Sequence, residues 1–355
     1  MPNVVPVWGY HRNMASLLFV TNSLTGGGAE RSTNLIANEL FFRGHKVGVV
    51  PINSGPEDLV ALACSIFSVN RTWQSGPKET LRALRRFLKI IKQFQPDFII
   101  LNCDIPELFG LFVKGNHQII VVEHSNKPWM NRSKLGRLVR KIYKFRNILW
   151  ISVRDSLKIW PDGLPPHKSI NNPILDVKRI DAATNVEINY LKRLVFVGRL
   201  SVEKGIQNFL EIAKETKVSS IVIGDGPLRS NLIKEYQDLM EVAFMGQTKN
   251  PWEELTQNDL LIIPSLHEGD GLVVVEALSA GVPILVSDIP EFRRFGLPER
   301  NYCRDTNQFI ATIGSNKDNL ADLIVPNEIV APILSTRSIH SIADSWEIFL
   351  QTARY

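Results

Sequence analysis

Two glutamates lie eight residues apart in the stretch HEGDGLVVVEALSAGVP, and their carboxylates are the first candidates for chemistry. Glu268 opens this stretch, and Glu276 follows between Val275 and Ala277 in an apolar, helix-like run. Between the two glutamates lie a turn and the start of that run: Gly269, Asp270, Gly271 and Leu272. Carboxylates accept bidentate, charge-assisted hydrogen bonds, which suits a ligand rich in hydroxyl groups. A mid-helix glutamate is more often solvated, but an apolar setting makes that explanation weaker here.

Groups that suit an anion occur in two other stretches. Arg199 and Lys204, in VGRLSVEKG, can neutralise a diphosphate, the arginine through its planar fork and the lysine as a point charge. The stretch GGGAER includes Gly27 and Gly28 and predicts a helix N-terminus whose free N–H groups favour a phosphate. A third glycine turn, GDGP, is a candidate wall of a nucleotide pocket: Gly224, Gly226 and Pro227. The simpler alternatives are solvated loop charges and tight turns that need glycine only for backbone reasons.

The elements that must position these groups alternate regularly between strand and helix. Apolar runs typical of buried strands occur at residues 16–22, 46–52, 97–103, 118–124 and 147–152, and again at 193–197, 219–223, 242–246 and 259–265. Helical periodicity separates most of them, so the fold class is α/β with doubly wound parallel sheets. Ligands of such sheets bind beyond the carboxyl ends of the strands, where the candidate loops lie.

A chain of 355 residues exceeds the size at which one core usually keeps growing, so two domains are expected. The proline-rich segment PDGLPPHKSINNP predicts the hinge between them. The predicted organisation is a flexible leader (1–15), an N-terminal domain (16–168), a C-terminal domain (169–336) and a terminal helix (337–355) that packs back on the first domain. No apolar run approaches a membrane span, and three distant cysteines indicate a reducing cytoplasm.

In this order and spacing, GGGAER, GRLSVEKG, GDGP and the stretch containing Glu268 and Glu276 resemble the family 4-like retaining glycosyltransferases of the GT-B fold. The resemblance covers most of the chain from Ser16 to about Ile289. It implies two Rossmann-like domains facing across a cleft. It also implies that a hexose-type sugar passes from a UDP- or GDP-sugar to a hydroxyl of a glycan or polyprenyl-pyrophosphate-linked glycan in bacterial surface polysaccharide biosynthesis, such as lipopolysaccharide or capsule.

The resemblance also implies roles for single residues. Glu268 contacts the transferred sugar, assisted by the turn that follows it, and Glu276 holds the ribose. Arg199, Lys204 and the N-terminal glycine turn bind the diphosphate, and His124, which ends a strand, lies near the donor sugar. No Asp-x-Asp pair occurs in the chain, so we expect neither a metal nor another cofactor. The family commonly has an aromatic residue where Asp270 stands, and sugar selection is expected to differ accordingly.

The first 180 residues are basic, whereas the remainder has an excess of acidic residues. One helical face of the basic half is predicted to be cationic: Arg137, Arg140, Lys141 and Lys144. Such a face is either solvated or binds anionic lipid headgroups, which predicts a cytoplasmic protein peripheral to the inner membrane. No nucleic-acid-binding motif accompanies the positive charge, so nucleic acid is not expected as a partner.

Three other functions remain open. A dinucleotide oxidoreductase would use similar units, but Arg31 stands where the third glycine of its fingerprint belongs, and the acidic ribose ligand is missing. A nucleotide-sugar epimerase shares the GT-B architecture. A non-catalytic protein that binds anions or membranes would explain the basic half but leave the pair Glu268 and Glu276 without a role.

Overall fold

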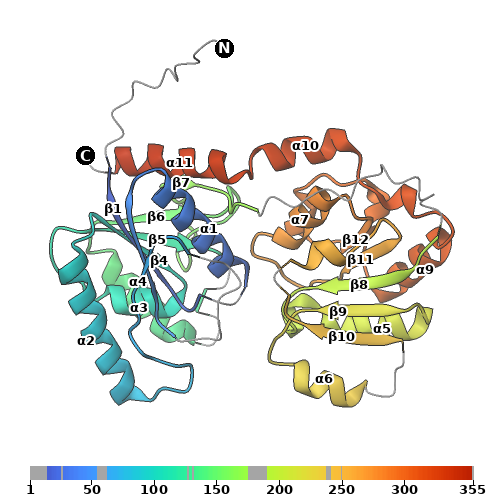
Figure 1. Cartoon of the computed structure of the whole chain (residues 1–355), viewed down its shortest axis with the longest axis horizontal. Coiled ribbons are helices and arrows are strands. Elements are labelled where there is room, and N and C mark those ends of the chain that lie inside the picture. The colour runs from blue at the N-terminus through green and yellow to red at the C-terminus, as the bar shows by residue number, and fades with distance from the viewer. Residues whose placement is uncertain are drawn as a thin grey trace, which may run out of the picture.

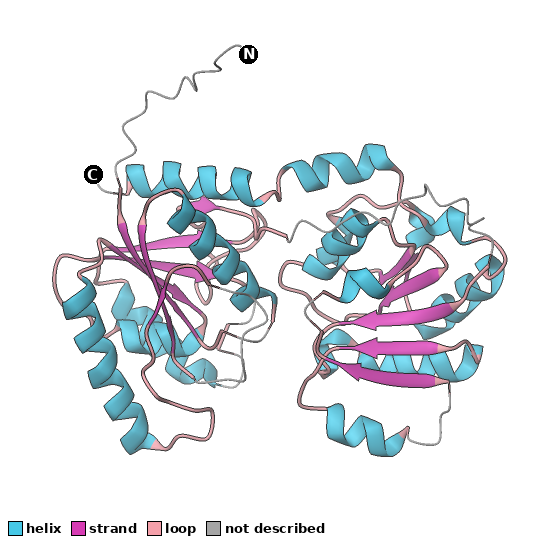
Figure 2. Ribbon diagram, viewed as in Figure 1, coloured by secondary structure: helices cyan, strands magenta, loops and turns pink. Residues whose placement is uncertain are grey.

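A computed structural model of the chain describes residues 14–24, 27–53, 62–125, 128–129, 132–174, 190–236, 241–248 and 250–353. Most of the predicted leader lies outside these ranges, as do Gly26 of the first glycine turn and residues 175–189 beyond the predicted hinge segment. The described residues form two parallel sheets, each with helices on both faces, which confirms the predicted fold class (Figure 2).

The N-terminal domain is built on a seven-stranded parallel sheet in the order β3-β2-β1-β4-β5-β6-β7. Its strands are β1 (Ser16–Thr21), β2 (Lys46–Pro51), β3 (Ser65–Ile66), β4 (Phe98–Asn102), β5 (Gln118–Glu123), β6 (Ile148–Ser152) and β7 (Lys168–Ser169). The central strands are apolar except at their ends and are buried along nearly their whole length, as expected of strands with both faces covered.

Four helices of this domain follow strands: α1 (Gly28–Phe42), α2 (Pro77–Phe94), α3 (Asp104–Gly110) and α4 (Ser133–Tyr143). Helix α1 covers one face of the sheet, where Phe19 and Leu40 are buried. Helices α2, α3 and α4 cover the other face through a core that includes Phe87, Phe109 and Tyr143. The order of elements brings the ends of β1, β4 and β5 together at one edge of the sheet.

The C-terminal domain has a six-stranded parallel sheet in the order β10-β9-β8-β11-β12-β13. Its strands are β8 (Arg193–Val197), β9 (Ser220–Ile223), β10 (Val242–Gly246), β11 (Asp259–Ile263), β12 (Ile284–Ser287) and β13 (Tyr302–Cys303). Its helices are α5 (Ile206–Thr216), α6 (Arg229–Glu235), α7 (Leu272–Ala280), α8 (Pro290–Arg293) and α9 (Thr306–Asn316). Short 3-10 helices complete the domain at η2 (Val202–Lys204), η3 (Pro251–Glu254), η4 (Glu299–Asn301) and η5 (Leu320–Leu323).

The last two helices, α10 (Asn327–Ser335) and α11 (Ile339–Thr352), run across both domains (Figure 1). Helix α10 contacts α7 of the second domain, and α11 lies against α1 of the first. Trp346 of α11 is buried in the N-terminal core, where its ring meets Phe19 edge-on at a centroid distance of 6.0 Å. The chain therefore returns to the first domain after completing the second.

No element was predicted between Phe295 and the terminal helix, and the structure contains β13, α9 and α10 there. Strand β13 has only two residues, too few for period-2 alternation, and α10 contains Pro332, which interrupts a helical pattern. None of the helices in the described parts of the chain combines the length and the apolar composition that crossing a membrane requires.

Candidate functional site

A cleft of about 1030 Å³ lies between the two domains and is lined from both sides. The first domain contributes the start of α1 and the end of β5, and the second contributes the loops after β8, β9 and β11. These loops follow the carboxyl ends of parallel strands, which is where open α/β sheets bind ligands. Among the described residues that line the cleft, three carry a cationic guanidinium or ammonium group: Arg31, Arg199 and Lys204.

Glu268 lies in the loop between β11 and α7 and is buried, with 8% of its surface exposed. The Lys204 ammonium donates to both of its oxygens at 2.7 Å, and the Ser265 hydroxyl donates to Oε1 at 3.0 Å. Lys204 is held by the turn after it, because Gly205 has φ +67° and a Cβ atom there would lie 1.9 Å from the Pro264 carbonyl oxygen. Glu268, which was predicted to bind the sugar, and Lys204, which was predicted to bind the diphosphate, are therefore in direct contact.

Glu276 lies on α7 with 3% of its surface exposed, and its partner comes from the other domain. The Arg31 guanidinium, in the first turn of α1, forms an ion pair with its carboxylate. The two helices also approach each other beside this pair, since a Cβ atom at Gly28 would lie 2.8 Å from Leu272 Cδ1. Glu276 thus faces the cleft, as a ligand-binding carboxylate would, but it is paired across the cleft.

The N-terminal glycine turn lies at the cleft, where Gly27 and Gly28 are exposed. The Gly27 N–H donates to Glu30 Oε2 at 3.1 Å, so an internal carboxylate caps this amide. Burial raises the pKa of Glu30, and the hydrogen bond from Gly27 and the nearby cation Arg199 partly offset this increase. A phosphate approaching the turn would therefore compete with a carboxylate for the same amide.

Arg199 is exposed and follows β8 on the opposite wall. The GDGP turn packs directly beneath it, because a Cβ atom at Gly224 would lie 1.9 Å from the Gly198 carbonyl oxygen. Gly224 lines the cleft, whereas Gly226 packs against the backbone of Leu200. Pro227 is likewise not among the lining residues. Gly226 therefore supports the wall from behind, whereas Pro227 is exposed, and the predicted nucleotide contact of these two residues stays a prediction.

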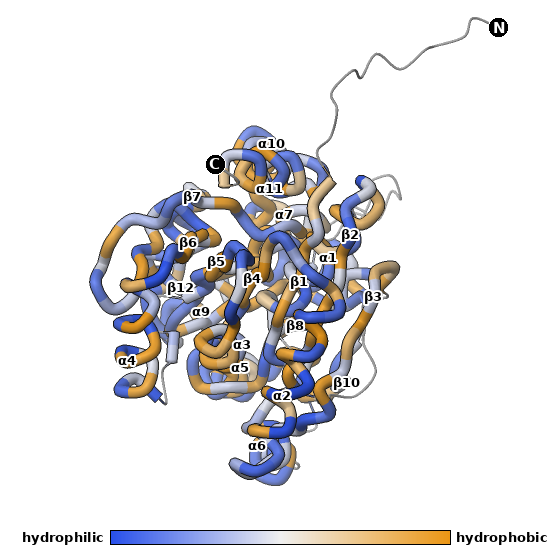
Figure 3. The backbone as a smooth tube through the Cα atoms, turned by 90° about the vertical axis from the view of Figure 1, so that its left-hand side faces the viewer, coloured by the Kyte–Doolittle hydropathy of each residue, from blue (hydrophilic) through white to orange (hydrophobic). Residues whose placement is uncertain are grey.

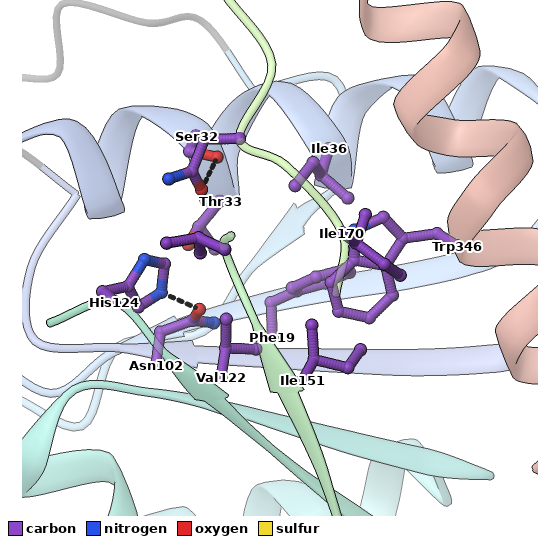
Figure 4. Close-up of a pocket in the computed structure, with 12 residues that line it drawn as sticks. Phe19, Ser32, Thr33, Ile36, Asn102, Val122, His124, Ile151, Ile170 and Trp346 are labelled. Atoms are coloured by element: carbon purple, nitrogen blue, oxygen red, sulfur yellow. Dashed lines mark hydrogen bonds between the residues drawn. The ribbon is translucent and has the colours of Figure 1, made fainter. Parts of the chain in front are cut away.

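His124 follows β5 and faces the cleft beside the loop of the second domain, since a Cβ atom at Gly269 would lie 2.5 Å from its carbonyl oxygen. Its Nε2 lies 2.9 Å from Asn102 Oδ1, and its Nδ1 has no hydrogen-bond partner among the described residues (Figure 4). Burial lowers the pKa of His124 to about 4, so the ring is neutral near pH 7. Because Asn102 Oδ1 can only accept, Nε2 carries the proton and Nδ1 has a free lone pair.

Asp270 has partners that the sequence did not predict. Arg337 donates to its two oxygens at 2.6 and 2.9 Å, Arg294 donates at 2.6 Å, and the Asn172 amide donates at 2.9 Å. Asn172 in turn accepts from the Ser32 hydroxyl of α1 at 2.7 Å. Two arginines thus bind the carboxylate, and together with Asn172 they tie the loop to the two segments that connect the domains, at Asn172 and at Arg337. Asp270 still lines the cleft, and its predicted contact with the donor stays a prediction.

Arg140 was predicted to lie on a cationic surface with Arg137, Lys141 and Lys144, and this prediction is wrong. It is 2% exposed and bridges two buried acids: Glu107 Oε1 at 2.6 Å and Glu123 Oε2 at 2.5 Å. Burial raises the pKa of Glu123 to about 7, although Arg140 opposes the shift. These acids come from α3 and β5, so the acid-free stretch around α4 gave no sign of them.

The exposed face of α4 is also more apolar than predicted. Arg137 and Lys141 are exposed, and Lys144 pairs with Asp162 at 2.8 Å. Apolar residues stand beside them on the surface: Leu135, Leu138, Ile142 and Phe145. Figure 3 shows hydrophobic and hydrophilic residues mixed along this helix.

Sequence reasoning overlooked Arg31, Asn102 and Arg337 as parts of the site. Arg31 stands in the glycine-turn motif, and its place at a helix start beside a predicted phosphate site was an available signal. The other two had no local signal, because their partners lie 22 and 67 residues away in the sequence. Among the described residues, no group of three or more His, Cys, Asp or Glu side chains is arranged to hold a metal ion.

Two family models match the chain. Glycosyltransferase Family 4 matches residues 26–155, and Glycosyl transferases group 1 matches residues 180–325. Together they match parts of both domains, and the unmatched residues between 155 and 180 contain the predicted hinge.

Relatives of the chain carry glycosyltransferase names. It is 26% identical over 248 residues to an uncharacterized glycosyltransferase of Methanocaldococcus jannaschii, and it spans 60% of that relative's length and 60% of its own. A second relative is the Campylobacter jejuni GalNAc-alpha-(1->4)-GalNAc-alpha-(1->3)-diNAcBac-PP-undecaprenol alpha-1,4-N-acetyl-D-galactosaminyltransferase. The two sequences are 23% identical over 283 residues, and the aligned region covers 75% of this chain and 77% of that protein. The crystal structure of Anabaena HepE in complex with UDP-glucose has the same fold, with a TM-score of 0.72 and 15% identity over 95% of this chain and 99% of that one.

Proposed function

We propose that this chain, which belongs to the glycosyltransferases of the GT-B fold, moves a hexose-type sugar from a UDP- or GDP-sugar to a hydroxyl of a glycan or lipid-linked glycan. The observation that carries the proposal is the composition of the cleft. Two buried carboxylates, Glu268 and Glu276, suit sugar and ribose hydroxyls, while Arg199 and Lys204 suit the diphosphate between them. The Anabaena structure with the same fold is a complex with UDP-glucose, which supports this class of donor.

In the proposed reaction, the bond between the anomeric carbon and the diphosphate oxygen breaks, and the acceptor oxygen bonds to that carbon on the same face, so the configuration is retained. The proton of the acceptor hydroxyl passes to the departing phosphate oxygen. Arg199 and Lys204 stabilise the negative charge that develops on the leaving nucleoside diphosphate, and the amides of the N-terminal glycine turn assist. Because these cations lie in the cleft already, we expect no metal, and the direct attack of the acceptor needs no covalent nucleophile. His124, neutral and with a free Nδ1 lone pair, accepts a hydrogen bond from a hydroxyl of the sugar.

The acceptor is proposed to be lipid-linked and to reach the first domain at a membrane. The C. jejuni relative is named for an undecaprenyl-diphosphate-linked acceptor, which supports this chemistry and a role in surface polysaccharide biosynthesis. Leu138 and Phe145 of α4 are 56% and 85% exposed, beside the cations Arg137 and Lys141. An apolar stripe flanked by cations suits insertion at the interface of an anionic bilayer. We therefore propose peripheral attachment through α4.

Transfer is tested first with a thermal-shift panel of nucleoside diphosphates and nucleotide sugars, since a ligand at 100 times its dissociation constant adds about 2.7 kcal/mol of stability. The donor found is then supplied with glycan acceptors, and NMR of the product reports the anomeric configuration. Glu268→Gln is expected to lower the transfer rate roughly 100-fold or more. The matched control is Glu211→Gln on the exposed side of α5. Equal activity of both variants, or turnover of the donor without an acceptor, would contradict the proposal.

Membrane attachment has a separate test. Vesicles with anionic lipid should co-sediment the wild-type chain and should release it when Leu138 and Phe145 are replaced by Ser. Zwitterionic vesicles should bind more weakly, because the cations of α4 then have no partner. The control is Leu81→Ser on α2, which is also exposed. Unchanged sedimentation of the α4 variant would show that this face is only solvated.

A further inference from the structure

Each carboxylate proposed to hold the donor is already bound to a cation. Lys204 occupies both oxygens of Glu268 at 2.7 Å, and Arg31 occupies Glu276 from the opposite domain. Among the described residues, Glu276 Oε1 has no hydrogen-bond partner, and its contact with Arg31 is an ion pair. Neither carboxylate can offer its full accepting capacity to a hydroxyl group while the cation remains in place. A donor whose phosphates pair with these cations would therefore free both carboxylates for its hydroxyl groups.

A diphosphate is an anion of the right kind, and Arg31 lies near the groups proposed to bind it. It belongs to the same helical turn as Gly28, directly after the exposed glycine turn. Arg199, on the opposite wall, is close enough to Glu30, the neighbour of Arg31, to influence its titration. The side chain of Arg31 is 29% exposed, whereas that of Glu276 is 4% exposed, so the arginine is the partner with access to the open cleft.

The chemistry of arginine favours an exchange of partners. Desolvation lowers the pKa of Arg31, so its charge is incompletely hydrated although it reaches the cleft, and its pairing with a dianion is stronger than in bulk water. The planar guanidinium matches two phosphate oxygens at once, which an ammonium does not. A ribose, in contrast, offers only neutral hydroxyls, and these bind to a carboxylate better than to a cation.

We infer that Arg31 is a donor-binding residue that exchanges Glu276 for the diphosphate. Without a donor, Arg31 joins α1 to α7 across the cleft. With a donor, its guanidinium binds the diphosphate, and the released Glu276 accepts hydrogen bonds from the ribose. Lys204 and Glu268 separate in the same way, so the diphosphate releases both carboxylates for the hydroxyl groups on either side of it. This inference rests on the proposed function for the identity of the ligand.

The exchange predicts opposite effects on the two halves of a nucleotide. Isothermal titration calorimetry with inorganic pyrophosphate and with uridine or guanosine separates them. Arg31→Gln should weaken pyrophosphate binding roughly 10- to 100-fold, because a charge-assisted bond is lost, and should leave nucleoside binding equal or tighter. Glu276→Gln should do the reverse: it should tighten pyrophosphate binding, because Arg31 is freed, and weaken nucleoside binding. Arg31→Lys should fall between wild type and Arg31→Gln for pyrophosphate, because it keeps the charge without the fork.

The control is Arg85→Gln on the exposed side of α2, and thermal melts confirm that all variants are folded. If Arg31→Gln binds pyrophosphate like wild type, or if both cleft variants weaken both probes, the pair is a structural bridge and the inference is overturned. A wild type that binds no pyrophosphate overturns it as well. Failure of the proposed function looks different: the reciprocal pattern would be present, but no sugar would be transferred to any acceptor.

Discussion

The Asp270 carboxylate joins the loop of Glu268 to the two segments that connect the domains, at Asn172 and at Arg337. Removing its charge is expected to destabilise the protein. Arg337, two residues before α11, binds it at two points, and Arg294 and the Asn172 amide complete its shell. The side chains of Asp270 and Arg337 are only 5% and 4% exposed. The substitution Asp270→Asn keeps the shape of the residue and removes the charge.

The expected loss of unfolding free energy comes from the cationic side chains that Asp270→Asn leaves without a carboxylate. Arg337 would stay buried without its carboxylate, and breaking a buried pair from one side costs about 3–5 kcal/mol. Arg294 is 24% exposed and can hydrate, so it adds little to the cost. In a domain of this size, each kcal/mol lowers the Tm by about 2–4 °C, so Asp270→Asn should lower it by roughly 6 °C or more.

Differential scanning calorimetry and urea unfolding followed by tryptophan fluorescence measure this loss. Arg337→Met should cost a similar amount, whereas Asp270→Leu with Arg337→Met should recover most of it, because no buried charge is then left unpaired. Asp288→Asn is the control, since Asp288 also holds an arginine at two points but at the surface. The reasoning is refuted if Asp270→Asn is as stable as the control, or if the double variant loses the sum of the single losses.

Three further outcomes are expected. Arg140→Gln should lower the free energy of unfolding in urea titrations by about 3–5 kcal/mol, because it leaves Glu107 and Glu123 buried without a cation. Arg137→Gln, at an exposed position, should leave the stability unchanged. Equal losses in the two variants would contradict the burial of Arg140. His124 takes up a proton near pH 6.5 in the unfolded chain but only near pH 4 in the folded protein. Acidification from pH 6.5 to pH 4 should therefore lower the stability of the wild type relative to His124→Gln by up to about 3 kcal/mol. Parallel curves of stability against pH for the two proteins would contradict a depressed pKa. Transfer assayed after dialysis against EDTA should equal transfer with added Mg²⁺ or Mn²⁺, because cationic side chains neutralise the diphosphate; activity that depends on the ion would contradict this.

The sequence by itself determined the fold class and the candidate walls of the cleft. Period-2 and continuous apolar runs depend only on neighbouring residues, so the longer strands of both sheets were predictable, whereas the two-residue strands β3, β7 and β13 were not. The loops after these strands had to meet at one edge of each sheet because parallel strands share a direction. That is why Glu268, Arg199 and Lys204, predicted from motifs 64 or more residues apart, line one cleft.

The tertiary structure alone decided which charges face the ligand and which hold the protein together. Arg31 meets Glu276 across 245 positions of sequence, and Asp270 meets Arg337 across 67. Local periodicity identifies a helical face but not the group opposite it, so Arg140 was assigned to a surface when two acids from other elements bury it. An ion pair forms where the fold brings two desolvated charges together, and neither partner's own stretch of sequence records that distance.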